Sequence, residues 1–383
     1  MNSRGRILLV TTSYMRARDG SDAAGVFVFD LANELARHIR VTVVAPGTSE
    51  GRSMQGLVEV RTFRAPEKAL SLLSPGNPFD WLAIVRTLRS LKKVTLASNA
   101  DADVRHALAL WVLPCGWATR SLQRKQGIAY SVWALGSDIW SLGRLPLVRS
   151  ALGLVARDAK HAYADGMRLA EDAKRITGRE FAFMPSTRKL IADRTRAVAM
   201  QPPYRLLFLG RWHKNKGVDL LLDALRLLDE QDWARIAEVH IAGGGPLETE
   251  VRLAVDALKV LGRPMRLSGY LDSERAAAAF SAADRLLLPS RVESIPVIYS
   301  DAMKFSLPVV AMPVGDLPTL IGEGTGWLAE RVDAAAFAEA IRAALGQGYD
   351  TEAVALMNRR FSIEKIAADI AASVDAPVRS ALP

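Results

Sequence analysis

The sequence predicts an α/β protein of two Rossmann-like, doubly wound domains that face a cleft. Three observations carry this prediction. The chain has 383 residues, which is the length of two domains of ordinary size. Short apolar runs alternate with amphipathic segments, as in parallel βαβ units. The alternation restarts after the tripeptide Gln201-Pro202-Pro203, whose composition is typical of a linker between domains.

The first domain is expected over residues 1–200. The segment VFVFDLANELARHI, residues 26–39, has apolar residues at helical spacing and lies between two strand-like runs. This first unit predicts a parallel sheet with a crossover helix. Runs rich in Val, Leu, Ile and aromatic residues predict strands at 6–13, 41–46, 58–63, 130–137 and 180–186.

The second domain is expected over residues 201–360. Its strands are predicted at 205–210, 238–242, 265–269, 285–289, 308–312 and 326–329. Polar clusters follow three of these strands, with the sequences GRWHKNKG, GGGP and SRVESIP. Ligands of open α/β sheets bind beyond the carboxyl ends of the strands. The sequence therefore places a ligand site at one edge of the second sheet.

The net charge of +9 is concentrated in the first half of the chain. Residues 1–200 contain 30 basic and 17 acidic residues, whereas residues 201–383 contain 20 basic and 24 acidic residues. A basic half indicates an anionic partner, which is a membrane surface, a nucleic acid or an acidic substrate. The chain has no helix-turn-helix, zinc or RNP pattern, so we expect no nucleic-acid partner.

The sequence also predicts a cytoplasmic protein. No apolar run approaches the length of about 18 residues that spans a bilayer. The first ten residues lack the apolar core and cleavage site of a secretory signal. Cys115 is the single cysteine of the chain and cannot form an internal disulfide, which fits a reducing compartment.

Two cations stand close together after the first strand of the second domain. Arg211 and Lys216 lie five positions apart in GRWHKNKG, between this strand and the amphipathic segment VDLLLDALRLL. An arginine can bond two phosphate oxygens, a lysine adds a point charge, and a helix start favours the same anion. The loop therefore fits a diphosphate; the alternative is a solvated basic loop.

Two acids flank a proline in LLLPSRVESIPVIYSDAMKFSLPVVAMP, residues 286–313. Pro296 suits the first turn of a helix that runs to about Lys304. Glu293 is then a loop residue, and Asp301 lies one and a half turns into the helix. Carboxylates accept hydrogen bonds from vicinal hydroxyls, so the pair fits a sugar and a ribose. The alternative makes Glu293 a helix-start acid and Asp301 a solvated one.

In their order along the chain, these motifs resemble the GT-B-fold retaining glycosyltransferases of the family 4 type, or group 1. The motifs are GRWHKNKG, GGGP, SRVE, Asp301 followed by AM, and PVVA at 308–311. The resemblance covers most of the chain. It implies that the helical ending, residues 361–383, crosses back to the first domain. It also implies transfer of a hexose from a nucleotide-diphosphate sugar, with no cofactor and no metal.

The resemblance also implies a role for each site residue. Arg211 and Lys216 hold the donor diphosphate and stabilise it as the leaving group, Glu293 holds the donor sugar, and these three are the catalytic residues. Asp301 binds the ribose. The remaining nucleotide-binding positions are Gly25, Gly244, Ser294, Ile295 and Pro296. On the acceptor side, Gly136 and Asp138 belong to the motif LGSD.

Several positions depart from the family pattern. Leu135 replaces the usual histidine of LGSD, and Asp301 is one C–C bond shorter than the usual glutamate. His106 is out of register with the family's histidine and is expected to be structural. The sequence DAD at 101–103 is expected to cap a loop. A retaining transferase works without a protein base if the departing phosphate takes the acceptor proton.

Two segments combine apolar and basic residues and fit an anionic membrane surface, residues 77–96 and 138–160. The alternative is ordinary core-facing helices with solvated basic faces. Together with the basic first half, these segments predict a peripheral enzyme on the inner face of the cytoplasmic membrane. Such an enzyme is expected to act on a saccharide or lipid-linked acceptor in envelope or exopolysaccharide biosynthesis. The other functions considered are a nucleic-acid-binding protein, a non-catalytic nucleotide-sugar-binding relative and a sugar-nucleotide epimerase.

Overall fold

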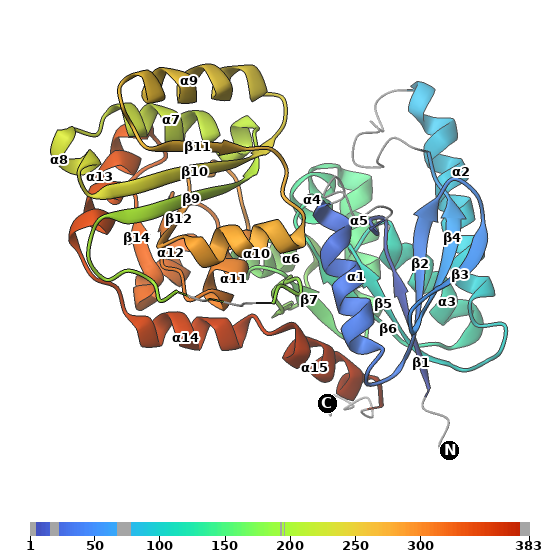
Figure 1. Ribbon diagram of the computed structural model, residues 1–383. Helices are drawn as coiled ribbons and strands as arrows, with labels where there is room; N and C mark the ends of the chain where they lie inside the picture. The colour runs from blue at the N-terminus through green and yellow to red at the C-terminus, as the bar shows by residue number, and fades with distance from the viewer. Residues whose placement is uncertain (1–4, 16–22, 67–77, 192–193, 195, 376–383) are drawn as a thin grey trace. The chain divides into compact units, whose positions relative to one another are not determined.

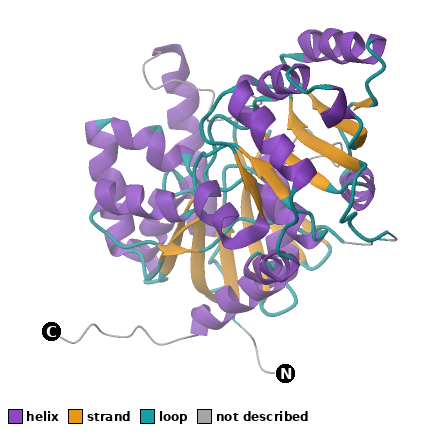
Figure 2. Ribbon diagram, turned by 90° about the vertical axis from the view of Figure 1, so that its left-hand side faces the viewer, coloured by secondary structure: helices purple, strands orange, loops and turns teal. Residues whose placement is uncertain are grey.

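The computed structural model describes residues 5–15, 23–66, 78–191, 194 and 196–375. Its chain divides into two compact units, each built on one sheet (Figure 1). The first unit extends to Lys189 and also includes the chain from Ile363 onward. The second unit contains residues Leu190–Ser362. Helices flank the strands of both sheets (Figure 2). The prediction of two parallel-sheet α/β domains is therefore confirmed.

The first sheet has eight strands in the order β3-β4-β2-β1-β5-β6-β7-β8. All neighbours pair in parallel except β3, which is antiparallel to β4. The predicted strands did not include β3, β5 and β7. The strands are β1 (Arg6–Val10), β2 (Arg40–Gly47), β3 (Gly51–Gln55), β4 (Val58–Arg64), β5 (Val104–Leu110), β6 (Tyr130–Ala134), β7 (Ala162–Ala164) and β8 (Ala182–Phe183).

Helices pack on both faces of this sheet because the central strands are apolar on both faces. In β1, Leu8 and Val10 belong to one core cluster, which includes residues of α2, α3, α5 and α6. Ile7 and Leu9 belong to a second cluster, which includes residues of α1 and α15. The helices are α1 (Ala23–Leu35), α2 (Pro78–Ala97), α3 (Cys115–Gln126), α4 (Ser137–Trp140), η2 (Leu142–Arg144), α5 (Pro146–Asp158), α6 (Met167–Thr177) and α15 (Ile363–Asp375).

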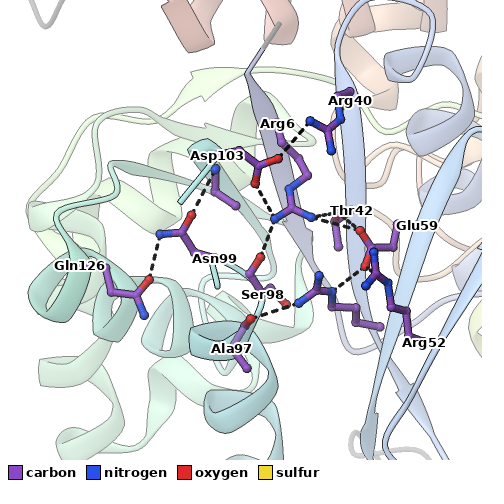
Figure 3. Close-up of polar contacts among 12 residues, drawn as sticks. Arg6, Arg40, Thr42, Arg52, Glu59, Ala97, Ser98, Asn99, Asp103 and Gln126 are labelled. Carbon is purple, nitrogen blue, oxygen red and sulfur yellow. Dashed lines mark hydrogen bonds and ion pairs between the residues drawn. The ribbon is translucent and has the colours of Figure 1, made fainter. Parts of the chain in front are cut away.

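A buried ion network holds four segments of the first unit together (Figure 3). Arg6 of β1 is only 2 % exposed. Its guanidinium contacts Glu59 of β4 at 3.0 Å and Asp103 at 2.6 Å, and donates to the Ser98 carbonyl at 2.8 Å. Asp103 also pairs with Arg40 at 3.1 Å. The last acid of DAD therefore ties strand ends together in this structure.

The second sheet has six parallel strands in the order β11-β10-β9-β12-β13-β14. All six strands predicted for this domain are present. They are β9 (Tyr204–Arg211), β10 (Ile236–Gly244), β11 (Met265–Ser268), β12 (Arg285–Leu288), β13 (Val309–Ala311) and β14 (Gly326–Leu328). The helical segments are η3 (Lys214–Lys216), α7 (Val218–Arg226), α8 (Glu230–Trp233), α9 (Glu248–Val260), α10 (Ser273–Ala282), α11 (Val297–Lys304), α12 (Leu317–Leu320), η4 (Ile321–Thr325), α13 (Ala334–Gly346) and α14 (Thr351–Arg360).

The tripeptide at 201–203 lies inside the second unit, because the preceding residues are already fastened to that unit. Arg194 donates hydrogen bonds to the carbonyls of Phe280 and Ala283, which lie at the end of α10, at 3.0 and 2.9 Å. Arg196 pairs with the buried Asp284 at 2.6 Å. Carbonyls at a helix end have no partner within the helix, so a cationic donor stabilises them.

Candidate functional site

The candidate site lies where the strand order of the second sheet changes direction. Strand β9 pairs with β10 on one side and with β12 on the other, and the chain reaches β12 only after β10 and β11. Loops that leave such neighbouring strands diverge to opposite sides of the sheet, which opens a crevice at their carboxyl ends. The loops after β9 and β12 carry the predicted cations and acid.

The loop after β9 begins with an exposed arginine and is anchored by buried residues. Arg211 ends the strand with an exposed side chain that has no hydrogen bond or ion pair to another residue in the described ranges. The next residue, Trp212, is buried. Gly217 has φ of +70°, and a Cβ built on it would lie 1.8 Å from the carbonyl oxygen of Pro289. Only glycine fits there, so this loop lies directly against the loop after β12.

Lys216 and Glu293 meet across these two loops. The ammonium of Lys216 forms a charge-assisted hydrogen bond with Oε1 of Glu293. The same carboxylate oxygen accepts a hydrogen bond from the Ser290 hydroxyl at 3.1 Å. The Glu293 side chain is largely buried, whereas Lys216 is half exposed. The pair therefore joins a largely buried acid of one loop to a half-exposed cation of the other.

Backbone contacts fix the segment from Glu293 to Pro296. Gly315, after β13, has φ of +56°, and a Cβ built on it would lie 2.2 Å from the Ser294 carbonyl oxygen. The Asp316 amide donates to that oxygen at 3.1 Å. Ile295 is buried, and Pro296 is the residue that precedes the first turn of α11. The predicted start of this helix is therefore correct to one residue.

Gly244 ends β10 beside Arg211, with which it is in register. Its carbonyl accepts hydrogen bonds from the Trp212 amide and from the Tyr270 hydroxyl, both at 2.8 Å. The Tyr270 ring lies so close that a Cβ on Gly244 would be 2.6 Å from it. The glycine turn therefore allows Tyr270, which follows β11, to pack at the edge that carries Arg211.

Asp301 differs from the accessible or solvated acid that the sequence suggested. It lies in α11 as predicted, but its side chain is fully buried and pairs with Lys304 at 3.4 Å. An aspartate is about 1.5 Å shorter than the family's glutamate and does not project as far from the helix. Its contact with a ribose stays a prediction.

Gly25 lies in the first turn of α1, so this helix begins before the predicted helical segment, which started at residue 26. A Cβ built on Gly25 would lie 2.6 Å from the backbone of Tyr14 and Met15. The glycine therefore lets the loop after β1 cross the helix start. A role of Gly25 in nucleotide binding stays a prediction.

Gly136 and Asp138 form a turn after β6 in the first unit. Gly136 precedes α4 and is packed against the ring of Trp140. Asp138 is buried and accepts hydrogen bonds from the backbone amides of Val112 at 2.6 Å and Leu135 at 3.2 Å. Burial raises the pKa of Asp138 to about 6. Its carboxylate thus joins two loops of the first unit, and an acceptor role stays a prediction.

His106 has the structural environment that the sequence suggested. It is buried in β5, and its Nε2 lies 2.9 Å from the Ser131 hydroxyl. Burial lowers its pKa to about 3, so the ring is neutral at physiological pH. Across the part of the chain that the structure describes, no group of three acidic, histidine or cysteine side chains could hold a metal ion. Independence from metal stays a prediction.

The structure thus brings together Arg211, Lys216, Gly244 and the segment 293–296 at one edge of the second sheet. Sequence reasoning missed Ser290 and Gly315, which hold Glu293 in place. Gly315 could have been found from the sequence, because it is a glycine that follows the strand in PVVA. The serine within SRVE was quoted as part of a motif but received no role of its own.

Residues 203–347 match the family model described as Glycosyl transferases group 1. The second unit therefore contains a group 1 glycosyltransferase domain. The chain is 35 % identical over 157 residues to the amylovoran biosynthesis glycosyltransferase AmsK of Erwinia amylovora, covering 39 % of this chain and 38 % of that protein. It is 37 % identical over 143 residues to the D-inositol 3-phosphate glycosyltransferase of Corynebacterium efficiens, covering 35 % and 32 %. The matched part thus spans less than two fifths of these curated relatives.

Solved structures match nearly the whole chain. Sucrose-phosphate synthase of Thermosynechococcus elongatus superimposes with a TM-score of 0.71 at 18 % identity, covering 97 % of this chain and 98 % of that chain. HepE of Anabaena, in complex with UDP and glucose, superimposes with a TM-score of 0.68 at 15 % identity, covering 97 % and 100 %. At these identities the similarity establishes the fold, which is that of GT-B glycosyltransferases.

Proposed function

We propose that this chain is a glycosyltransferase that moves a hexose from a nucleotide-diphosphate sugar to a saccharide or lipid-linked acceptor, with retention of configuration. The proposed setting is envelope or exopolysaccharide biosynthesis. The observation that carries the proposal is the meeting of Lys216 and Glu293 at the crevice beside β9, within a domain that matches the group 1 family. The biosynthetic setting is supported by the name of the amylovoran relative.

The chemistry at this edge requires a cationic site that faces a leaving diphosphate. Negative charge develops on the phosphate as the glycosidic C–O bond breaks, and fixed cations stabilise that charge. Arg211 supplies an exposed guanidinium, and Lys216 supplies an ammonium held by Glu293. The Glu293 carboxylate retains oxygen lone pairs that can accept hydrogen bonds from sugar hydroxyls. The site therefore suits departure of a nucleoside diphosphate.

Retention follows if the acceptor attacks from the face that the diphosphate leaves. The acceptor oxygen forms the new bond to the anomeric carbon, and its proton passes to an oxygen of the departing phosphate. No protein base is then needed, which accommodates Leu135 in place of the family's histidine. We propose that no metal takes part, because Arg211 and Lys216 supply the positive charge. The anomeric configuration of the product, observed by NMR during the first turnovers, tests retention.

A screen of sugar nucleotides tests the function itself. UDP-, GDP- and ADP-sugars are added separately to the protein, and the thermal unfolding midpoint is recorded. A bound donor stabilises the folded state by mass action, about 2.7 kcal/mol at 100 times Kd. We expect one nucleotide class to raise the midpoint and also to be consumed when an acceptor extract is present. Binding without consumption would instead indicate a non-catalytic relative, and no binding by any class would refute the proposal.

We also propose that α2 rests on an anionic membrane surface. Leu82, Arg86, Arg89 and Lys93 recur at helical spacing and are all exposed, so they form one stripe along α2. Trp81 is exposed beside the start of this stripe. Cations attract anionic lipid, while Trp and Leu side chains enter the interface. None of the helices in the described ranges is long and apolar enough to cross a membrane.

In the second candidate segment, two cations contact backbone carbonyls of the first unit. Arg149 of α5 donates to the carbonyl of Arg175 at the end of α6, and Lys160 donates to the carbonyl of Ser373 in α15. Arg144 and Arg157 of the same segment are exposed, so a membrane role for residues 138–160 stays a prediction. The membrane test concerns α2.

Flotation with liposomes tests the role of α2. We expect the protein to float with anionic vesicles at low salt and to be released as the salt concentration rises, because electrostatic attraction is screened. The double variant Arg86→Ala/Arg89→Ala should lose about 1 kcal/mol of binding per charge, or roughly 30-fold in total. The control Arg124→Ala/Lys125→Ala removes two exposed cations from α3 of the same unit. Equal losses in both variants would contradict the assignment to α2.

A further inference from the structure

We propose that Arg291 is a positioning residue that fixes the Lys216 loop against the Glu293 loop and thereby sets the geometry of the catalytic pair. This inference rests on the function proposed above for Lys216 and Glu293. Arg291 itself lies two residues before Glu293, in the loop after β12. It does not need to touch the substrate, because its contacts are with the backbone that carries Lys216 and with the start of the next helix.

The contacts of Arg291 join three parts of the second unit. Its two terminal nitrogens bind the two carboxylate oxygens of Asp219, in the first turn of α7, at 2.7 and 2.9 Å. One of these nitrogens also donates to the carbonyl of Lys214 at 2.6 Å. Its backbone amide donates to the carbonyl of Asn215 at 2.8 Å. Four hydrogen bonds thus link Arg291 to both sides of Lys216. Two go to Lys214 and Asn215, which precede it, and two go to Asp219, which follows it by three residues.

The Lys216 loop is thereby held at both of its ends. At one end, Lys214 and Asn215 bond to Arg291. At the other end, the backbone of Gly217 lies against the carbonyl of Pro289, at a distance that leaves no room for a Cβ. Lys216 lies between these two contacts and has a long side chain with four rotatable bonds. The position of its ammonium therefore depends on a backbone that Arg291 holds in place.

The ion pair with Asp219 is more than a solvated surface contact. The side chains of Arg291 and Asp219 are 32 % and 27 % exposed, and the pair has the two-pronged geometry that a guanidinium and a carboxylate favour. Burial by itself raises the pKa of Asp219, but the hydrogen bond and charge of Arg291 outweigh it and hold the pKa below its ordinary value. Asp219 is thus ionised at neutral pH.

A lysine could not replace these contacts. An ammonium is a single point charge, whereas the planar guanidinium bonds two carboxylate oxygens and a carbonyl in one orientation. Misplacement of a catalytic group by about 1 Å can cost about 10²-fold in rate. Arg291→Lys should therefore keep the charge but lose much of the positioning.

Arg342 provides a matched control in the same unit. Its side chain is also 32 % exposed, pairs with Asp232 at 2.8 Å and donates to the carbonyl of Leu227 at 2.6 Å. It lies in α13, outside the loops that carry the candidate site. Arg342→Ala thus removes a similar set of contacts without touching the Lys216 loop.

The activity test compares these variants on the donor that the screen identifies. We expect Arg291→Ala to lower kcat by about 10²-fold, Arg291→Lys by at least about tenfold, and Arg342→Ala by less than twofold. The thermal midpoints of Arg291→Ala and Arg342→Ala should fall by similar amounts. Equal kcat values for the Arg291 and Arg342 variants would overturn the proposal.

A second test is independent of activity and so separates this inference from the proposed function. The coupling between Lys216 and Glu293 is measured from the unfolding equilibrium constants of the single and double alanine variants. In the unmodified background we expect the unfolding equilibrium constant of the double variant to differ by a factor of about three or more from the value that two independent substitutions would give. The coupling should vanish in the Arg291→Lys background and persist in the Arg342→Ala background. Persistence in the Arg291→Lys background would refute the positioning role, even if the chain transfers no sugar.

Discussion

Replacing Arg211 with alanine is expected to lower kcat/KM for sugar transfer by about 10²- to 10³-fold without a measurable loss of stability. If the proposed function holds, the variant loses one or two charge-assisted hydrogen bonds to the diphosphate, each of about 1.5 to 3 kcal/mol. These bonds are strongest in the transition state, when charge gathers on the leaving group. The guanidinium is exposed and has no hydrogen bond or ion pair among the described residues, so its removal breaks no polar contact with them.

Arg205 supplies the control for this substitution. It lies near the opposite end of β9, and its side chain is also exposed. Steady-state kinetics and urea unfolding are measured for both alanine variants. We expect Arg205→Ala to match the unmodified protein in both measurements. Normal turnover and donor affinity in Arg211→Ala would remove this residue from the proposed site. A large loss of stability instead would show that the arginine serves the fold.

Replacing Arg6 with leucine should reduce the free energy of unfolding by about 3 to 5 kcal/mol. The substitution removes one partner from a buried ion network and leaves Glu59 and Asp103 with fewer positive neighbours in a region that excludes water. It also removes the donor that satisfies the Ser98 carbonyl. Arg6 and the residues it contacts lie in four different segments of the first unit, so its loss weakens several contacts between segments at once (Figure 3).

The control for Arg6 is an exposed ion pair in the same unit. Lys174 pairs with Glu180 at 2.5 Å, and both side chains are mostly exposed. Exposed ion pairs contribute little to stability, so Lys174→Ala should change the unfolding midpoint in urea only slightly. A cost for Arg6→Leu as small as that of Lys174→Ala would mean that the network contributes little to the stability of the first unit.

Much of the candidate site could be predicted because its parts lie in short contiguous motifs. Apolar runs identified β9 and β12, and the residues that follow each run belong to the same edge in a parallel sheet. This geometric rule placed Arg211 and Lys216 near Glu293 before any contact was known. It applies to Gly244 for the same reason, since β10 is parallel to β9.

Other features depend on packing between distant segments and had no local signal. Asp301 has the sequence position of a ligand-binding acid, but the packing around α11 buries it beside Lys304. Gly25 precedes the predicted helical segment, yet it lies inside α1, where the loop after β1 packs against it. The exposure of a polar side chain is set by its three-dimensional neighbours, and periodicity along the chain does not specify it.

By itself, the sequence determined two parallel α/β sheets and the loops that carry the cations and the acid, because alternating apolar runs and local motifs encode these features over short distances. Only the tertiary structure decided that Lys216 pairs with Glu293, that Arg291 joins their loops, and that Arg6 connects distant segments of the first unit. Each of these contacts joins residues that are far apart along the chain. Their distances therefore exist only once the sheets have formed and their loops have packed.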